Sequence, residues 1–221
     1  MLFLHGYLSC GNSFYYQTEY FKGLFNVYAP DLTGFGKNGY MPYPYSLDDY
    51  VESVYNYVKD NRLEKPHVIA HSFGARIVIK AVSKYPDLFD KIVVTGGAGL
   101  KPKFSLKKWV RKTTYKVLKI FLPKSKLQRF YSKDYLSLSP VMKQSFIKIV
   151  NEHLDGYLCS IKNQVLLIYG KKDKETPIYM AKRLNGLIKN SKLTIYKDAG
   201  HFAFIDCPYK FNMEVREFLL S

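Results

Sequence analysis

A serine on a predicted tight turn is the first feature of this sequence that could do chemistry. The segment Ala70–Gly74 (AHSFG) follows an apolar run and precedes a helical pattern. It matches the G-x-S-x-G pattern of a nucleophile elbow, with alanine in place of the first glycine. The residues two before and two after the serine must be small, because the backbone turns sharply there. The turn also places Ser72 at a helix N-terminus, where the helix dipole favours a developing negative charge.

A carboxylate and an imidazole follow two later apolar runs in the same way. Asp173 closes a turn after the run Val165–Tyr169. His201 closes a turn after the run Leu193–Tyr196. Near-continuous apolar runs separated by helical patterns are typical of parallel strands that are buried on both faces. Because sites in open parallel sheets form at the carboxyl ends of the strands, we expect Ser72, Asp173 and His201 to share one edge of a sheet.

The order of these residues, together with two glycine-containing loops, resembles the α/β-hydrolase superfamily. That superfamily uses the chain order nucleophile, acid, histidine, which here corresponds to Ser72, Asp173 and His201. The stretch Phe3–Tyr7 (FLHGY) matches the family's HG oxyanion loop, and Pro30–Gly36 (PDLTGFG) matches its D-x-x-G-x-G loop. The resemblance covers nearly the whole chain outside one insertion. Its motifs are specific for the fold and not for a substrate.

The resemblance implies a Ser–His–Asp mechanism that needs neither a metal nor a cofactor. Ser72 would attack a carbonyl carbon, His201 would take its proton and return it to the leaving group, and Asp173 would orient the imidazole. The backbone N–H groups of Phe73 and Tyr7 would form the oxyanion hole. A serine nucleophile argues against the dehalogenase and epoxide-hydrolase branches, which use aspartate at the elbow.

Other polar residues near these motifs have simpler structural interpretations. We expect His5 and Asp31 to hold their own loops, and His71 to pack or bond locally. Arg76 lies one helical turn after Ser72 and has two interpretations. It is a partner in a buried structural contact, or it binds a substrate carboxylate, as an arginine does at this position in the menaquinone-pathway lyases of the superfamily. The sequence favours the structural role and leaves the second open.

Further apolar runs and helix signals complete the predicted fold. The remaining runs are Leu2–Leu4, Phe25–Ala29, His67–Ala70 and Ile92–Val94. With the two runs named above they predict an α/β fold, a mostly parallel sheet of about six strands flanked by helices. Ser46 and Asp49 have the spacing of a capping box, and Ser139 with Pro140 resembles an N-cap followed by the first helical residue.

The chain begins at what would be the third strand of the full superfamily fold. The predicted strand Phe25–Ala29 would then be an exposed sheet edge, which favours aggregation. Three explanations fit: the first two strands are dispensable, another chain covers the edge, or the chain is truncated. Truncation or a misplaced start is favoured because Met1 adjoins the first strand directly.

Residues 101–163 break the alternation of strands and helices. They predict a helical cap inserted into a core formed by residues 1–100 and 164–221. Caps of the superfamily roof the pocket and select the substrate, so we expect one apolar helix face to cover the serine and Trp109 to lie near the substrate. That face consists of Leu106, Val110, Val117, Phe121 and Leu122.

The insertion also carries most of the positive charge. The chain has 34 Lys and Arg against 18 Asp and Glu, a net charge of +16. Residues 101–133 hold twelve of these basic residues and no acidic one. A solvated helix face is the simplest explanation, and adhesion of a basic amphipathic helix to an anionic membrane is the second. Steering of an acidic substrate or nucleic acid is disfavoured, because 28 of the basic residues are lysine and no nucleic-acid motif is present.

The composition and the N-terminal sequence bear on where in the cell the protein is located. No apolar run approaches the roughly 20 residues of a membrane span, and the N-terminus lacks the basic region of a signal peptide. The three cysteines are an odd number without metal-type spacing, which predicts free thiols in a reducing compartment and a cytoplasmic location.

These observations predict a carboxylesterase-like serine hydrolase that acts on small ester or acyl substrates through an acyl-enzyme. Two alternatives stay open. One is a carbon–carbon lyase or hydrolase that uses the same triad, with Arg76 on a substrate carboxylate. The other is a non-catalytic module that binds membrane surfaces through its basic cap.

Overall fold

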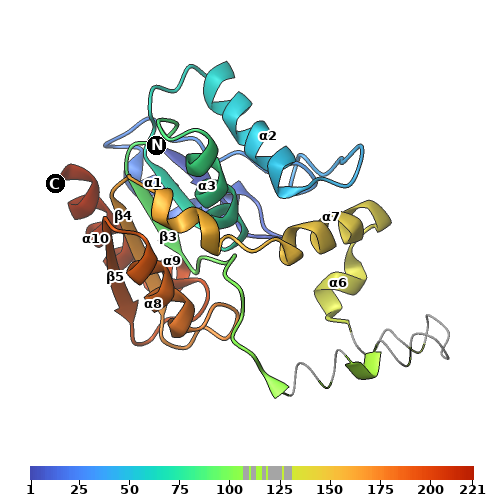
Figure 1. The fold of residues 1–221 in the computed structure, drawn as a ribbon. Coiled ribbons are helices and arrows are strands. Elements are labelled where there is room, and N and C mark those ends of the chain that lie inside the picture. Colours follow the sequence, from blue (N-terminus) through green and yellow to red (C-terminus); the bar gives the residue numbers. More distant parts are fainter. Residues whose placement is uncertain (107–109, 111–112, 116–117, 119–125, 127–130) are drawn as a thin grey trace.

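A parallel sheet runs through the middle of the molecule, with helices on both faces (Figure 1). The computed structural model describes residues 1–221 except 107–109, 111–112, 116–117, 119–125 and 127–130. In the described residues the strands pair in chain order: β1 Leu2–Leu4, β2 Val68–His71, β3 Ile92–Thr95, β4 Val165–Gly170 and β5 Ser191–Tyr196. This layered arrangement is the α/β fold that the alternation of strands and helices predicts.

Successive side chains of the strands point to opposite faces of the sheet, so the strands build two cores. The larger core lies against α2 Leu47–Asp60, α3 Phe73–Lys84 and α8 Ile178–Leu187. The smaller core lies against the 3₁₀ helix η1 Gly11–Phe14 and the helices α1 Tyr15–Phe21, α9 Ala203–Asp206 and α10 Pro208–Leu220. Burial on both faces explains why β1 to β4 are near-continuous apolar runs, whereas β5 at the sheet edge is only partly buried.

Two helix starts match their sequence signals. In α2 the capping box is complete, because Ser46 Oγ accepts the Asp49 N–H at 3.3 Å and Asp49 Oδ2 accepts the Ser46 N–H at 2.7 Å. Ser139 caps α7 (Pro140–Asn151) by accepting the Met142 N–H at 3.3 Å. Both predictions are confirmed.

The predicted strand Phe25–Ala29 is reduced to a single bridge between Tyr28 and Leu2. The Tyr28 N–H donates to the Met1 carbonyl at 2.9 Å, and the Phe3 N–H donates to the Tyr28 carbonyl at 2.8 Å. The ladder cannot continue past Ala29, because Pro30 has no N–H to donate. The described sheet therefore has five strands, and the sixth that the sequence predicts is a one-residue contact at its edge.

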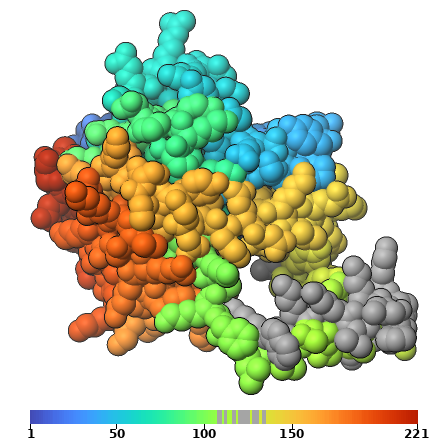
Figure 2. All heavy atoms as spheres, viewed as in Figure 1, coloured from blue at the N-terminus to red at the C-terminus, as the bar shows by residue number. Residues whose placement is uncertain are grey.

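The described part of the insertion is helical and lies beside the core near α2 (Figure 1). It contains α6 Lys133–Ser137, α7 and the 3₁₀ helix η3 Asp155–Ser160. Side chains of α7 hold the loop before α2: Ser145 Oγ donates to the Tyr45 carbonyl, and Lys148 Nζ to the Pro44 carbonyl, both at 2.7 Å. In Figure 2 the surface around α7 is accordingly continuous with the blue surface of that loop.

The helix face that we expected to cover the serine does not do so where the structure describes it. Leu106 and Val110 are 65% and 48% exposed. The other members of that face, Val117, Phe121 and Leu122, lie outside the described residues, and so does Trp109. Apolar contact with the core comes instead from α7, through the buried Met142 and Ile149, and from the segment after it, through the buried Leu154 and Leu158. Amphipathic spacing shows that a helix has an apolar face, but not which surface the face meets.

Cys10, Cys159 and Cys207 are free thiols, as predicted. No helix among the described residues combines the length and the apolar composition that crossing a bilayer requires.

Candidate active site

Ser72 occupies the sharp turn between β2 and α3. Its φ of 48° and ψ of −100° are a strained backbone conformation for a residue with a side chain. The Ser72 N–H donates to the Thr95 carbonyl on the neighbouring strand at 3.1 Å, which holds the turn against the sheet. A Cβ on Gly74 would lie 2.2 Å from the Leu4 carbonyl oxygen. The requirement for a small residue after the serine is therefore a direct consequence of how closely the turn approaches β1.

Asp173 follows β4 and is bound on both carboxylate oxygens. Oδ1 accepts the N–H groups of Glu175 and Thr176 at 2.8 and 2.9 Å. Oδ2 accepts the Thr176 hydroxyl at 2.6 Å and the Nδ1–H of His201 at 2.8 Å. Burial by itself would raise the pKa of the Asp173 carboxyl, but the hydrogen bonds from His201 and Thr176 outweigh it and hold that pKa below its ordinary value. The carboxylate is thus ionised and firmly oriented.

The loop after β3 lies between the serine and the histidine. Gly96, with φ +54°, packs so closely that a Cβ there would lie 3.1 Å from the Nδ1 and Cε1 atoms of His201. The Ala98 N–H in the same loop donates to the Ser72 carbonyl at 3.4 Å. The structure therefore brings all three predicted residues to one edge of the sheet, as parallel topology requires.

The Asp–His half of the arrangement is formed, and the Ser–His half is open. Asp173 occupies Nδ1 of His201, which leaves Nε2 as the ring nitrogen available to the serine. Among the described residues no hydrogen bond joins Ser72 Oγ to His201. Contacts of this kind are commonly long without substrate and tighten when the substrate binds.

Tyr7 and Phe73, the predicted oxyanion donors, lie in ring contact, with centroids 5.4 Å apart. In the described structure neither backbone N–H donates to another protein group. The Tyr7 ring also packs edge-on against Phe35 and Phe146, and its hydroxyl donates to the Met142 carbonyl of α7 at 3.2 Å. The free N–H groups of Tyr7 and Phe73 therefore belong to residues whose aromatic rings pack together. Tyr7 is also hydrogen-bonded to α7.

His5 and Asp31 hold their own loops, as the sequence predicts. His5 is fully buried; its Nδ1–H donates to the Gly6 carbonyl at 2.7 Å, and its Nε2 accepts the Leu32 N–H at 2.9 Å. Asp31 accepts the N–H groups of Gly11 and Lys37, each at 2.7 Å. Neither group is left free for catalysis.

Arg76 is bound to α7. Its Nη1 donates to the carbonyls of Ile149 and Glu152 at 2.9 and 3.0 Å, which caps the C-terminal end of that helix. One turn further along α3, Lys80 bridges Asp48 at 2.8 Å and Glu152 at 2.5 Å. Arg76 and Lys80 of α3 thus both bind the C-terminal end of α7.

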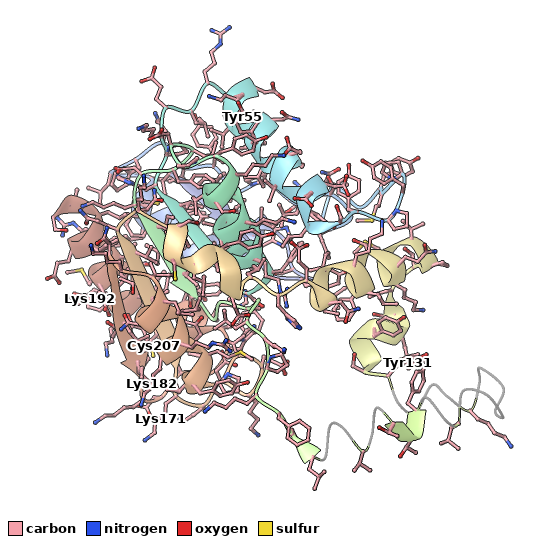
Figure 3. All side chains as sticks on the ribbon, viewed as in Figure 1. Tyr55, Tyr131, Lys171, Lys182, Lys192 and Cys207 are labelled. Carbon is pink, nitrogen blue, oxygen red and sulfur yellow. The ribbon has the colours of Figure 1, made fainter. Side chains whose placement is uncertain are left out.

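Thr176 is the residue of the site that sequence reasoning missed. It is buried, and its hydroxyl lies 2.6 Å from Asp173 Oδ2 and 3.4 Å from His201 Nδ1. A signal was present in the sequence: a threonine three residues after an aspartate commonly closes a side-chain turn on the backbone. The neighbouring Lys171, by contrast, is exposed and points into solvent (Figure 3).

A family model described as the alpha/beta hydrolase fold matches residues 1–123 and 116–208. The chain belongs to the alpha/beta hydrolase fold family. Among curated relatives, the AB hydrolase superfamily protein YisY of Bacillus subtilis is 25% identical, over 99% of this chain and 90% of its own length.

Two solved structures show the same fold. The esterase EaEST of Exiguobacterium antarcticum superposes with a TM-score of 0.79 at 20% identity and covers 100% of this chain and 91% of its own. The meta-cleavage product hydrolase CumD of Pseudomonas fluorescens superposes with a TM-score of 0.75 at 22% identity and covers 99% and 89%. At these identities the likeness establishes the fold alone.

Proposed function

We propose that this chain is a carboxylesterase-like serine hydrolase that acts on small ester or acyl substrates through an acyl-enzyme. The observation that carries the proposal is the buried Asp173 carboxylate on Nδ1 of His201, at the sheet edge where Ser72 occupies a strained turn. Membership in the hydrolase family and the similarity to an esterase support it.

The mechanism follows from the groups at this edge. The ionised Asp173 keeps the proton of neutral His201 on Nδ1, so Nε2 accepts the proton of Ser72 as its Oγ attacks the carbonyl carbon. The negative oxygen that forms is stabilised by the free N–H groups of Tyr7 and Phe73. The ester C–O bond then breaks, and His201 Nε2 gives its proton to the departing alcohol. Water attacks the acyl-serine by the same route, releasing the acid and restoring the serine.

The surroundings of the proposed oxyanion hole favour apolar acyl groups. The ring of Phe73, the residue after Ser72, packs against Tyr7, and the Tyr7 ring also packs against Phe146 of α7. Aromatic surfaces are favourable for hydrocarbon, and they offer few partners to a charged acyl chain.

A panel of chromogenic esters of increasing acyl length, together with a fluorophosphonate label, tests the proposal. Wild type is expected to turn over short esters and to be labelled at Ser72, and Ser72→Ala to lose both, with kcat falling at least about 10³-fold. Ser83→Ala is the matched control, because Ser83 lies at the far end of α3, where its hydroxyl donates to the Lys80 carbonyl. Turnover in Ser72→Ala equal to that of wild type would contradict the mechanism.

The carbon–carbon hydrolase alternative requires Arg76 to reach a substrate carboxylate. Nη1 of Arg76 is already committed to two backbone carbonyls of α7. We therefore assign Arg76 a structural role in the proposed enzyme, which leaves ester hydrolysis as the activity that the contacts of this residue favour.

One surface favours a second function, peripheral binding to anionic membranes. Phe104 and Leu106 are 79% and 65% exposed. They lie in the segment 101–133, which holds twelve basic residues and no acidic one. Exposed apolar side chains among lysines are typical of segments that bind the interface of anionic bilayers. Such binding would bring the proposed hydrolase to esters carried in a membrane.

Vesicle sedimentation tests this second function. Vesicles containing phosphatidylglycerol are expected to bind the protein at low salt and release it at high salt, because the attraction is screened. Replacing Lys101 and Lys103 by Glu is expected to weaken binding at least about tenfold. Replacing Lys182 and Lys192, which lie on the exposed surface of the core (Figure 3), is the matched control. Binding that is absent, or insensitive to salt, would exclude the interaction.

A further inference from the structure

His71 directly precedes the proposed nucleophile in the chain and contacts the proposed base. It is the last residue of β2, directly before Ser72, and is 2% exposed. Its Nε2 lies 3.1 Å from the backbone carbonyl oxygen of His201. A carbonyl oxygen only accepts, so Nε2 carries the proton and donates it. The two imidazole rings also pack together, with centroids 4.7 Å apart.

The other surroundings of the His71 ring are apolar or tightly closed. Phe202 and Phe204 contact it with centroids 4.8 and 5.1 Å away. On the remaining side a Cβ on Gly6 would lie 2.7 Å from Nδ1. Nδ1 is buried and has no hydrogen-bond partner in the part of the chain that the structure describes. The hydrogen bond to the His201 carbonyl is therefore the polar contact that holds this imidazole.

His71 stays neutral next to the group that takes the proton. Burial, and then the charge of a protonated His201, lower the pKa of His71 to about 3. The titratable groups facing it are His201, Asp173 and His5, which come from three different strand ends. With so low a pKa, His71 is too weak a base to compete with His201 for the serine proton, and it keeps its donor on Nε2 throughout the reaction.

We infer that His71 is a positioning residue, whose Nε2–H fixes the His201 backbone and whose ring supports the catalytic imidazole. The same strand end then carries the nucleophile and the contact that places the base, so that motion of one is transmitted to the other. This inference rests on the proposed triad and adds a residue that itself neither binds the substrate nor transfers a proton, and that acts through His201.

Three substitutions separate this role from mere packing. His71→Gln keeps an N–H donor near the position of Nε2, His71→Leu keeps the volume but removes the donor, and His71→Asn has a donor that is too short to reach the carbonyl. The readouts are kcat/KM against pH with a short chromogenic ester, the rate of fluorophosphonate labelling and the thermal unfolding midpoint.

His71→Leu and His71→Asn are expected to lower kcat/KM about 10- to 100-fold with little change in KM, since an error in positioning acts on the transition state. The pH profiles of these two variants are expected to differ from that of wild type, because the catalytic imidazole is no longer held in place. His71→Gln is expected to restore most of the activity and the wild-type profile. Full activity in His71→Leu, or a Gln variant as impaired as Leu at equal stability, would overturn the inference.

Two further outcomes are covered. If His71→Leu unfolds, the comparison of Gln with Asn remains decisive, because both side chains are polar amides that differ in reach. If wild type neither turns over esters nor reacts with the label, the proposed function fails. In that case the inference is tested by the downfield resonance of the His201 Nδ1 proton in NMR spectra, a measurement that does not depend on activity. Its loss in the Asn variant and retention in the Gln variant supports the inference, and its persistence in both overturns it.

Discussion

The sheet edge and the insertion differ in what holds them. At the sheet edge, both carboxylate oxygens of Asp173 accept hydrogen bonds. The Leu4 carbonyl lies so close to Gly74 that no side chain fits there. In the insertion, α7 is held at its ends by Tyr7 and Arg76, while Leu106 and Val110 face solvent. The contrast indicates that the residues of the proposed triad are held by the packed core, whereas the described part of the insertion is attached to the core through hydrogen bonds at the ends of α7.

The largest expected effect comes from a substitution at the sheet edge. Asp173→Asn is expected to lower kcat/KM about 10³- to 10⁴-fold, because the amide cannot hold His201 in the tautomer that frees Nε2. Steady-state kinetics with a short ester measure it. A loss below tenfold would show that another group orients the histidine.

The same substitution has a signature in stability. In the folded protein the hydrogen bonds from His201 and Thr176 hold the pKa of the Asp173 carboxyl below its ordinary value. The ionised carboxylate therefore adds to the free energy of unfolding above the ordinary pKa of aspartate. That contribution is lost as the pH falls through the lower pKa of the folded protein. Denaturant unfolding as a function of pH is expected to show a steeper acid decline in wild type than in Asp173→Asn.

The next effect compares buried with exposed positions of the insertion. Ile149→Ala on α7 is expected to lower the free energy of unfolding by about 2–4 kcal/mol, because it empties a buried site. Leu106→Ala is expected to change it by less than about 0.5 kcal/mol, because the side chain is exposed. Denaturant melts of the two variants measure the difference. Equal losses would mean that the segment around Leu106 packs on the protein as α7 does.

A smaller effect tests the attachment of α7. Arg76→Ala is expected to lower the free energy of unfolding by about 2 kcal/mol, since it leaves two helix-end carbonyls without their charged donor. Ester turnover is expected to survive with altered chain-length preference. Selective loss of activity on carboxylate-bearing substrates, at wild-type stability, would restore the carboxylate-binding role.

The smallest effect sharpens the description of the sheet edge. Thr176→Val removes one of the hydrogen bonds to Asp173 Oδ2 and keeps the shape of the side chain. We expect about a tenfold loss in kcat/KM, which corresponds to one charge-assisted hydrogen bond of roughly 1.4 kcal/mol. Thr194→Val, on β5 away from the site, is the control, because Thr194 bonds Glu214 instead.

Much of the fold was accessible from the sequence, because its signals are local. The alternation of apolar runs and helices predicted the parallel sheet. Ser46 and Asp49, three residues apart, predicted the cap of α2, and the adjacent Ser139 and Pro140 predicted the cap of α7. The predicted strand Phe25–Ala29 failed for a reason that is only partly local: Pro30 ends the ladder, but the partner backbone and its register come from β1.

By itself the sequence determined the order of Ser72, Asp173 and His201 and their positions after buried strands, since turn chemistry and strand burial leave their mark on neighbouring residues. Only the tertiary structure decided that Thr176 supports the carboxylate, that His71 holds the His201 backbone and that Arg76 is committed to α7. It also decided that α7, and not the helix face around Leu106, packs on the core. Each of these depends on which distant surfaces meet, and a hydrogen bond or a buried face is specified by both partners together.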